Sequence, residues 1–173
     1  IYYFSQSLSI HESLGDTIGI ATAHGNLGSI YQEAKNWKKS YFHLHKALWM
    51  KQQIKNFYGV AFDLFNLGSH FDMQNKRDSA AYYYQESLEL ATANDIAYVE
   101  EVTLQQLVDF HERAGQYQQA LAYHKRYQAL IEETKGLETE KKIASLEAQY
   151  ESEKKELEIE RLALDTAVQR SKN

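Results

Sequence analysis

Cysteine and proline are both missing from this sequence of 173 residues. The absence of cysteine excludes disulfides, thiolate zinc sites and thiol nucleophiles, but it is compatible with either a reducing or an oxidising compartment. The absence of proline, together with only 8 glycines, leaves few residues that break helices or form β-turns. The composition therefore predicts an all-α fold.

Long apolar runs and an excess of positive charge are missing as well. No stretch of the sequence approaches the roughly 18 consecutive apolar residues of a membrane span. The formal net charge is -5, and acidic and basic residues are mixed along the chain, so there is no basic stripe of the kind that a phosphate backbone requires. We therefore expect a water-soluble segment that does not bind nucleic acid.

Sequence motifs for catalysis and metal binding are also missing. The chain has no glycine-rich phosphate loop, no Gly-x-Ser-x-Gly elbow and no His-Glu-x-x-His run. His43 and His45 are two residues apart, so on a helix they point to different faces. We therefore expect no enzymatic activity, no cofactor and no metal site from these residues.

What the sequence does contain is a repeat with a period of 40 residues. The segments 26–31, 66–71 and 106–111 share an amide side chain, a leucine and then an aromatic or histidine ring. A glycine follows the leucine in the first two segments, and Val108 replaces it in the third. Because a small residue lets two helices approach closely, we expect looser packing around Val108.

A second pattern follows each of these segments in the same register. A small residue is followed four positions later by a bulky one, in Ser40 and Leu44, Ala80 and Tyr84, and Ala120 and His124. The two patterns together predict two helices in each unit. We place the turns between them at 35–37, 75–77 and 115–117, where Gly or Asn can adopt the left-handed conformation that ends a helix.

The Leu-Gly-x-x-Tyr motif at Leu27 and the Ala-x-x-x-aromatic motif at Ala80 resemble the tetratricopeptide repeat, whose usual period is 34 residues. The longer period resembles the long-repeat branch of kinesin light chains and many bacterial regulators. The resemblance implies an α-α superhelix, the TPR solenoid. The expected units are residues 1–16, as the second helix of a truncated first repeat, and complete repeats at 17–56, 57–96 and 97–136.

The start of the chain fits the register of a second helix without its first. Phe4, Ser7 and Leu8 fall where Tyr84, Ser87 and Leu88 fall in a complete repeat. In a solenoid each repeat buries its apolar face only against its neighbours. We therefore expect at least one further half-repeat to precede Ile1 in the natural protein.

Polar side chains on the first helix of each unit are the candidates for binding a partner. The resemblance implies that these helices line a concave groove, where an amide can donate to and accept from the backbone of an extended peptide. The alternative is that Asn26 and Asn66 only bond the end of a neighbouring helix. The candidate peptide- or partner-binding residues are Asn26, Ser29, Gln32, Glu33, Asn66, Ser69, Asp72, Met73, Gln106, Asp109, Glu112 and Arg113.

The expected groove is more acidic than basic. Glu33, Asp72, Asp109 and Glu112 stand against the single cation of Arg113. A terminal carboxylate is therefore a disfavoured ligand, and a basic or neutral peptide, or a segment of the same protein, fits the charges better.

The composition changes after Gly136, where aromatic side chains almost vanish and Glu and Lys dominate. A seven-residue spacing predicts a long charged helix over 137–173 that could form a coiled coil and a homodimer. The alternative is a single solvated helix, stabilised by pairs such as Glu151 and Lys155. The seam residues of the coiled coil would be Ile143, Tyr150, Leu157 and Leu164.

Repeats followed by such a connector resemble bacterial signalling proteins of the Bacteroidetes type, such as sensor histidine kinases and helix-turn-helix regulators with these repeats. The resemblance implies a protein-protein interaction scaffold that serves as the peptide- or partner-binding sensor region of a signal-transduction protein. We expect an extracytoplasmic sensor region of a membrane protein. The alternative is a cytoplasmic adaptor or transcriptional-regulator repeat domain that binds a protein partner or its own output domain.

Overall fold

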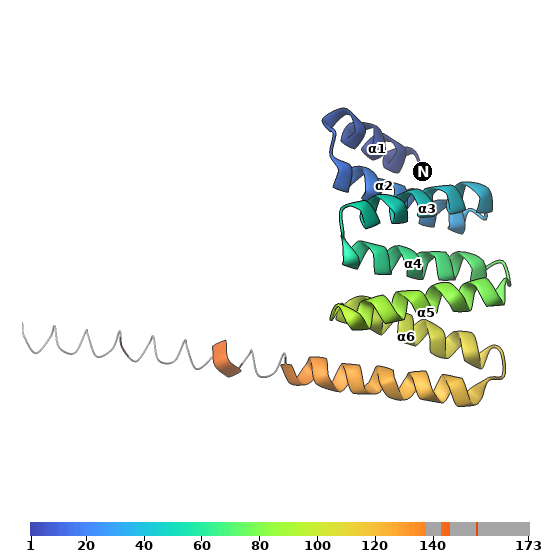
Figure 1. Cartoon of the computed structure of the whole chain (residues 1–173), viewed down its shortest axis with the longest axis vertical. Coiled ribbons are helices and arrows are strands. Elements are labelled where there is room, and N and C mark those ends of the chain that lie inside the picture. The colour runs from blue at the N-terminus through green and yellow to red at the C-terminus, as the bar shows by residue number, and fades with distance from the viewer. Residues whose placement is uncertain (138–142, 146–154, 156–173) are drawn as a thin grey trace, which may run out of the picture. The chain divides into compact units, whose positions relative to one another are not determined.

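The computed structural model describes residues 1–137, 143–145 and 155 of the chain. All the secondary structure in these residues is helical, and no strand occurs among them (Figure 1). The all-α repeat fold predicted from the sequence is therefore confirmed. The helices are α1 (Tyr2–Leu14), α2 (Thr17–Glu33), α3 (Trp37–Gln53), α4 (Phe57–Asp72), α5 (Arg77–Ala93), α6 (Ala97–Glu112), and residues 117–137.

The chain divides into two units, residues 1–130 and 131–173. In the second unit, residues 131–137 and 143–145 are helical, and Ile143 is exposed. The other predicted seam residues, Tyr150, Leu157 and Leu164, lie outside the described residues. The coiled coil and the homodimer through it therefore stay predictions.

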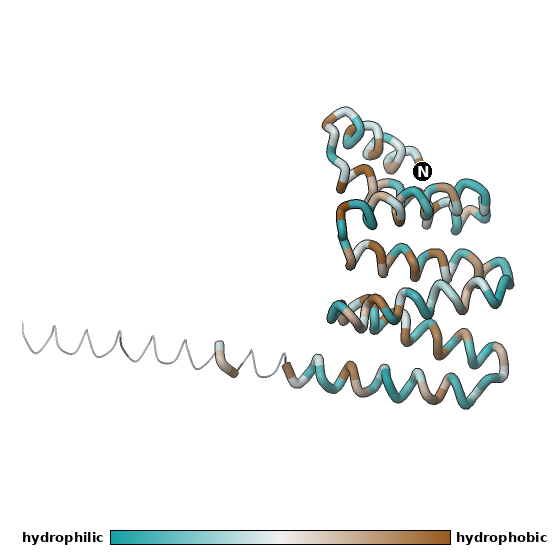
Figure 2. Tube along the Cα trace, viewed as in Figure 1, coloured by the Kyte–Doolittle hydropathy of each residue, from teal (hydrophilic) through white to brown (hydrophobic). Residues whose placement is uncertain are grey.

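The first unit is a stack of antiparallel helix pairs (Figure 1). The first pair is α2 with α3, the second pair is α4 with α5, and the third pair is α6 with residues 117–130. Helices α3 and α5 each contact the first helix of the next pair, and α2, α4 and α6 also contact one another in sequence. Helix α4 is packed from several sides, and it carries more hydrophobic residues than α5 (Figure 2).

The turns in this stack repeat every 20 residues. The last residue before the cap of each following helix takes a positive φ, between 53° and 70°. Asn75 and Gly115 confirm the prediction that Asn or Gly closes the helix. In the first turn, however, Lys35 takes this conformation instead of Asn36. The six positions are Gly15, Lys35, Lys55, Asn75, Asp95 and Gly115.

Asn36 has a different function from the one that its left-handed propensity suggested, because it caps the start of α3. Its side-chain oxygen accepts a hydrogen bond from the backbone N–H of Lys39 at 3.3 Å. Asp16 and Asn56 cap α2 and α4 in the same way, at 3.0 and 2.9 Å. A side-chain oxygen at this position satisfies a backbone donor that the helix leaves free.

Glycines set the close approach within the first two pairs. A Cβ added to Gly28 would lie 2.6 Å from Leu44, and one added to Gly68 would lie 2.4 Å from Tyr84. Leu44 and Tyr84 are fully buried, whereas the equivalent His124 in the third pair is exposed. In the third pair Val108 replaces the glycine, and the side chain of His124, which would pack against it, lies outside the core.

Helix α1 packs on α2, and none of its residues is fully buried. Phe4, Ser7 and Leu8 form its half-buried side, as the register predicts, while Tyr3 and Leu14 are 81% and 72% exposed. A preceding half-repeat stays a prediction. Among the described helices, none combines the length and the apolar content that crossing a bilayer requires.

Candidate functional site

A cavity of about 200 Å³ lies on the first helices of the first two pairs. Three of the residues selected from the sequence line it together, namely Asn26 and Ser29 from α2 and Asn66 from α4. Asn26 is exposed and Asn66 is half-buried. The 40-residue spacing thus places two equivalent amides at one opening.

The two amide side chains are unpaired. Neither the side chain of Asn26 nor that of Asn66 is hydrogen-bonded to another residue in the described part of the chain. The alternative, in which each amide bonds the end of a neighbouring helix, does not apply within these residues. Each amide therefore retains two N–H donors and a carbonyl acceptor for an incoming group.

A buried ion pair, which the sequence analysis did not identify, lines the same cavity. The Nζ of Lys51 on α3 lies 2.9 Å from both carboxylate oxygens of Asp63 on α4, and the two side chains are only 9% and 1% exposed. Gly25 and Gly59 leave space for it, because a Cβ on Gly59 would lie 2.6 Å from the Cδ of Lys51. Comparison of the repeats could have shown the pair, since Ala91 occupies the position equivalent to Lys51.

Burial controls the ionisation of this pair. Desolvation raises the pKa of Asp63 to about 6, although the charge of Lys51 opposes the shift. Lys51 donates its hydrogen bond to Oδ1, and Oδ2 accepts none within the described residues despite its ionic contact. The cavity therefore has a compact, overall neutral pair beside its two amides.

A second group of candidate residues forms contacts between the first and the second helix pair. The Nε2 of Gln32 donates to the Oγ of Ser69 at 2.8 Å and lies 3.2 Å from the sulfur of Met73. Gln32 is 9% exposed. The prediction that Gln32 is an open groove residue is therefore wrong, because its side chain crosses to the next repeat and is buried there.

A third group joins the second and third pairs by ion pairs. The guanidinium of Arg113 lies 2.6 Å from Asp72 and 2.8 Å from Asp109. The hydrogen bonds to Asp72 and Asp109 hold the pKa of Arg113 above its ordinary value. Arg113 is therefore bound between two of the four carboxylates counted from the sequence, and its single charge balances only one of them.

The remaining candidate residues belong to none of these groups. Glu33 and Glu112 are exposed, and Gln106 is half-buried. The structure therefore separates the twelve candidates into a cavity group, two inter-repeat groups and three residues that only share the same helices.

The histidines of α2 and the middle of α3 lie against other rings. The Nδ1 atoms of His24 and His43 lie 2.8 Å apart, and the ring of Tyr31 stacks on His43. Burial lowers the pKa of His24 to about 4, and burial also lowers the pKa of His43. His45 lies on another side of α3, against Tyr41. No cluster of three potential metal ligands occurs in the described ranges.

Comparison with known proteins identifies the repeat. Residues 19–93 match the sequence profile of the tetratricopeptide repeat. A comparison with curated proteins finds no match.

Solved structures share the fold. The chain is similar to BtubC (BKLC) from P. vanneervenii, with a TM-score of 0.66 and 21% identity over 78% of this chain and 56% of that chain. It is similar to aspartyl phosphate phosphatase F from Bacillus subtilis, with a TM-score of 0.71 and 18% identity over 76% of this chain and 35% of that chain. For the apo form of RapI the TM-score is 0.51, with 19% identity over 77% and 61% of the two chains.

At these identities the likeness concerns the fold alone. The chain spans between 35% and 61% of the length of these three solved structures. The profile thus assigns residues 19–93 to the tetratricopeptide repeat, and the solved structures share the all-α repeat fold of the described helices.

Proposed function

We propose that this chain is a non-catalytic scaffold for protein-protein interaction that binds an extended peptide segment on α2 and α4. One observation carries the proposal: Asn26 and Asn66 occupy equivalent positions of two successive repeats, line one cavity and have free amides. Two amides at a regular spacing can hold a peptide backbone whatever its side chains are.

The size of the cavity supports a peptide over a small molecule. Pockets for drug-sized ligands usually enclose about 300 to 1,000 Å³, whereas this cavity has about 200 Å³. Such a space suits one side chain of a longer segment that continues along the helices. Tyr58 and Phe62, whose rings stack, line it on one side.

The charges favour a neutral segment. Lys51 and Asp63 balance each other within the cavity, and Arg113 is bound to Asp72 and Asp109. The lining of the cavity therefore carries no net charge, because Lys51 and Asp63 are its only charged residues among those that the structure describes, and a charged peptide has little to gain there.

For the wider context, we propose a sensor region of a bacterial signal-transduction protein. The support is the resemblance of the repeats and connector to such proteins, and the likeness in fold to aspartyl phosphate phosphatase F and RapI. The alternative is a cytoplasmic adaptor or regulator. The sequence that follows Asn173 in the gene discriminates, because an apolar run of membrane-spanning length favours the first and a further polar helix favours the second.

The groove is tested with peptides selected from a random display library on the unaltered chain. Asn26→Ala with Asn66→Ala should weaken the binding of the selected peptides by about 5- to 150-fold, as expected for the loss of two hydrogen bonds of about 0.5 to 1.5 kcal/mol each. Gln118→Ala with Gln119→Ala removes two exposed amides from the third pair and is the matched control.

The melting temperature of both double variants should stay unchanged, because none of these amides supports the core. If the selected peptides bind the Asn26 and Asn66 variant as tightly as the original chain, the peptide site lies elsewhere and the proposal fails.

A further inference from the structure

One segment of this acidic chain contains no acidic residue at all. Residues 34–62 include six lysines and no Asp or Glu, and α3 lies in the middle of this segment. Helix α5, the equivalent helix of the next pair, carries Asp78, Glu86 and Glu89 against the single cation of Arg77. The outer helices of two successive repeats thus carry opposite charge.

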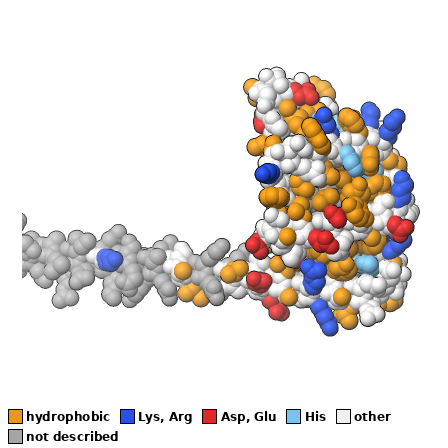
Figure 3. Space-filling view, viewed as in Figure 1, with side chains coloured by type: hydrophobic (Ala, Val, Ile, Leu, Met, Phe, Trp, Pro, Cys, Tyr) orange, Lys and Arg blue, Asp and Glu red, His pale blue; other side chains and the backbone are white. Residues whose placement is uncertain are grey.

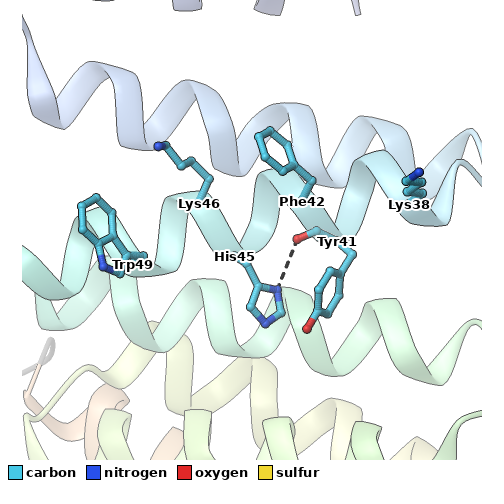
Figure 4. Close-up of a pocket in the computed structure, with 6 residues that line it drawn as sticks. All are labelled: Lys38, Tyr41, Phe42, His45, Lys46 and Trp49. Carbon is cyan, nitrogen blue, oxygen red and sulfur yellow. Dashed lines mark hydrogen bonds between the residues drawn. The ribbon is translucent and has the colours of Figure 1, made fainter.

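The outer face of α3 is also apolar. Phe42 and Trp49 are 59% and 56% exposed, and with Lys38 and Lys46 they line a shallow, mostly apolar pocket of about 580 Å³. Figure 4 shows Phe42, Lys46 and Trp49 projecting from one side of the helix, where the ammonium of Lys46 lies 5.7 Å from the ring centre of Trp49. A helix that is apolar on both its buried and its exposed side indicates a contact surface.

The outer face of α5 presents the complementary groups at the same repeat positions. Asp78 stands where α3 has Lys38, and Glu86 stands where α3 has Lys46. Between them Tyr82, which is 58% exposed, stands where α3 has Phe42. Figure 3 shows that hydrophobic (orange), basic (blue) and acidic (red) side chains are exposed together on one face of the molecule.

The charged groups on these two faces have no ion-pair partner within the described unit. None of the four side chains Lys38, Lys46, Asp78 and Glu86 forms an ion pair with another described residue. All four are exposed. Helices α3 and α5 of one copy contact each other through other side chains, such as His45 and Tyr83, whose Nε2 and hydroxyl oxygen lie 3.5 Å apart. The four charged groups take no part in these contacts, so they remain without an ion-pair partner within the described residues of one copy.

We propose that two copies of this chain associate through these faces, with α3 of each copy against α5 of the other. Both helices are second helices of successive pairs and run in the same direction (Figure 1). A two-fold rotation can therefore exchange them, so that both contacts form together and the assembly closes as a dimer. In this register Lys38 faces Asp78 and Lys46 faces Glu86.

A second copy is favoured over an unrelated acidic protein because this chain supplies both halves of the contact. The ion pairs set the orientation, while the rings of Phe42, Trp49 and Tyr82 supply the apolar area at the centre. The contact leaves the cavity with Asn26 and Asn66 open, so dimerisation and the proposed peptide binding are independent of each other.

The test is sedimentation equilibrium of the full chain with charge-reversed variants. The original chain should dimerise. Lys38→Glu with Lys46→Glu should weaken the dimer by at least about tenfold, and so should Asp78→Lys with Glu86→Lys, because like charges then face each other. Lys125→Glu, at an exposed position of the third pair, is the control and should leave the dissociation constant within about twofold.

Mixing the two reversed variants gives the decisive result, because a reversal alone also changes the net charge. One variant then has two acidic faces and the other has two basic faces, so a heterodimer should form at least as tightly as the original dimer. Circular dichroism should show unchanged helicity in every variant, since all the substituted side chains are exposed.

Three results would overturn the proposal. The first is an original chain that stays monomeric at every concentration, which would leave these faces to a different protein. The second is a dimer that both reversals leave intact, which would place the contact elsewhere, such as on the predicted seam at Leu157. The third is a loss of the dimer in both variants without its recovery in the mixture.

Discussion

The interface between the first and second helix pairs can be compared position by position with the interface between the second and third. In the first interface, Lys51 and Asp63 form a buried ion pair. At the equivalent positions of the second interface, Ala91 and Thr103 are fully buried without any charge. The same packing therefore forms with a buried ion pair in one interface and with uncharged residues in the other, so the fold does not require the ion pair.

The contacts between the first helices show the opposite distribution. Gln32 meets Met73 in the first interface without a charge, whereas Asp72 meets Arg113 at the equivalent positions of the second. The repeat thus determines which positions touch, and each interface uses its own chemistry there. The two interfaces differ in polar groups at shared positions, so substitutions that exchange these groups test whether each interface needs its own polar residues.

The largest effect is expected for the ion pair. Lys51→Ala should lower the free energy of unfolding at pH 7.5 by about 3 to 5 kcal/mol, because Asp63 is left buried and unpaired. Lys51→Ala with Asp63→Thr copies the second interface and should lie much closer to the original stability. Urea unfolding followed by circular dichroism measures both. A double variant as unstable as the single one would mean that the ion pair itself is needed.

Truncation of a buried leucine should lower the stability equally in the two interfaces. Leu67 and Leu107 occupy equivalent positions and are 0% and 1% exposed. Replacement of either by Ala should cost about 2 to 5 kcal/mol, as for other buried leucines. If Leu107→Ala proves much cheaper than Leu67→Ala in urea unfolding, the third pair is less cooperative with the stack than its burial indicates.

The acid stability should depend on a histidine that only the first interface contains. His70 is hydrogen-bonded to Ser40 at 2.9 Å, where the second interface has Phe110 and Ala80. Burial lowers the pKa of His70 to about 4. The unfolded chain therefore takes up a proton near pH 6.5 and the folded chain does not, so stability is full above this pH and falls as the pH drops.

Between pH 7 and pH 5 this histidine should cost at most about 2 kcal/mol. The raised pKa of Asp63 acts in the opposite direction, because the folded chain binds its proton first and gains stability as the pH falls. Ser40→Ala with His70→Phe should therefore reduce the acid sensitivity, measured as the difference in unfolding free energy between the two pH values. An unchanged difference would contradict the assigned role of His70.

A smaller effect is expected at Gln32. Its replacement by Ala should cost about 1 kcal/mol, since one hydrogen bond to Ser69 is lost and the amide oxygen already lacks a partner within the described residues. Gln106→Ala, at a half-buried groove position, should change stability by less than about 0.5 kcal/mol. If both variants have the melting temperature of the original chain, the buried role of Gln32 is refuted.

The smallest effect concerns the turns before and after the second pair. Lys55 and Asp95 both have a φ of 53°. Glycine tolerates this conformation better, so Lys55→Gly should stabilise the chain by about 0.5 to 1 kcal/mol, and Asp95→Gly by less because aspartate enters the left-handed region more readily. Melting temperatures measure the two gains. A loss of stability at Lys55 would show that the flexibility of glycine in the unfolded chain outweighs the strain.

Much of the fold was predictable because it follows from local periodicity. The spacing of Leu27 and Leu67, with a glycine after each, predicted both the buried face and the close approach of the second helix. The same register placed Asn26 and Asn66 on equivalent surfaces, and the structure brings both to one cavity. Their role in binding stays a prediction.

The all-α repeat, its 40-residue register and the apolar face of its helices therefore follow from the sequence, because the pitch of a helix fixes these locally. Which polar groups meet depends on the tertiary packing. Gln32 is buried against Ser69, and Arg113 binds Asp72, because these side chains cross between helices that lie about one repeat apart in sequence. Periodicity gives the direction of a side chain but not the partner that packing brings within its reach.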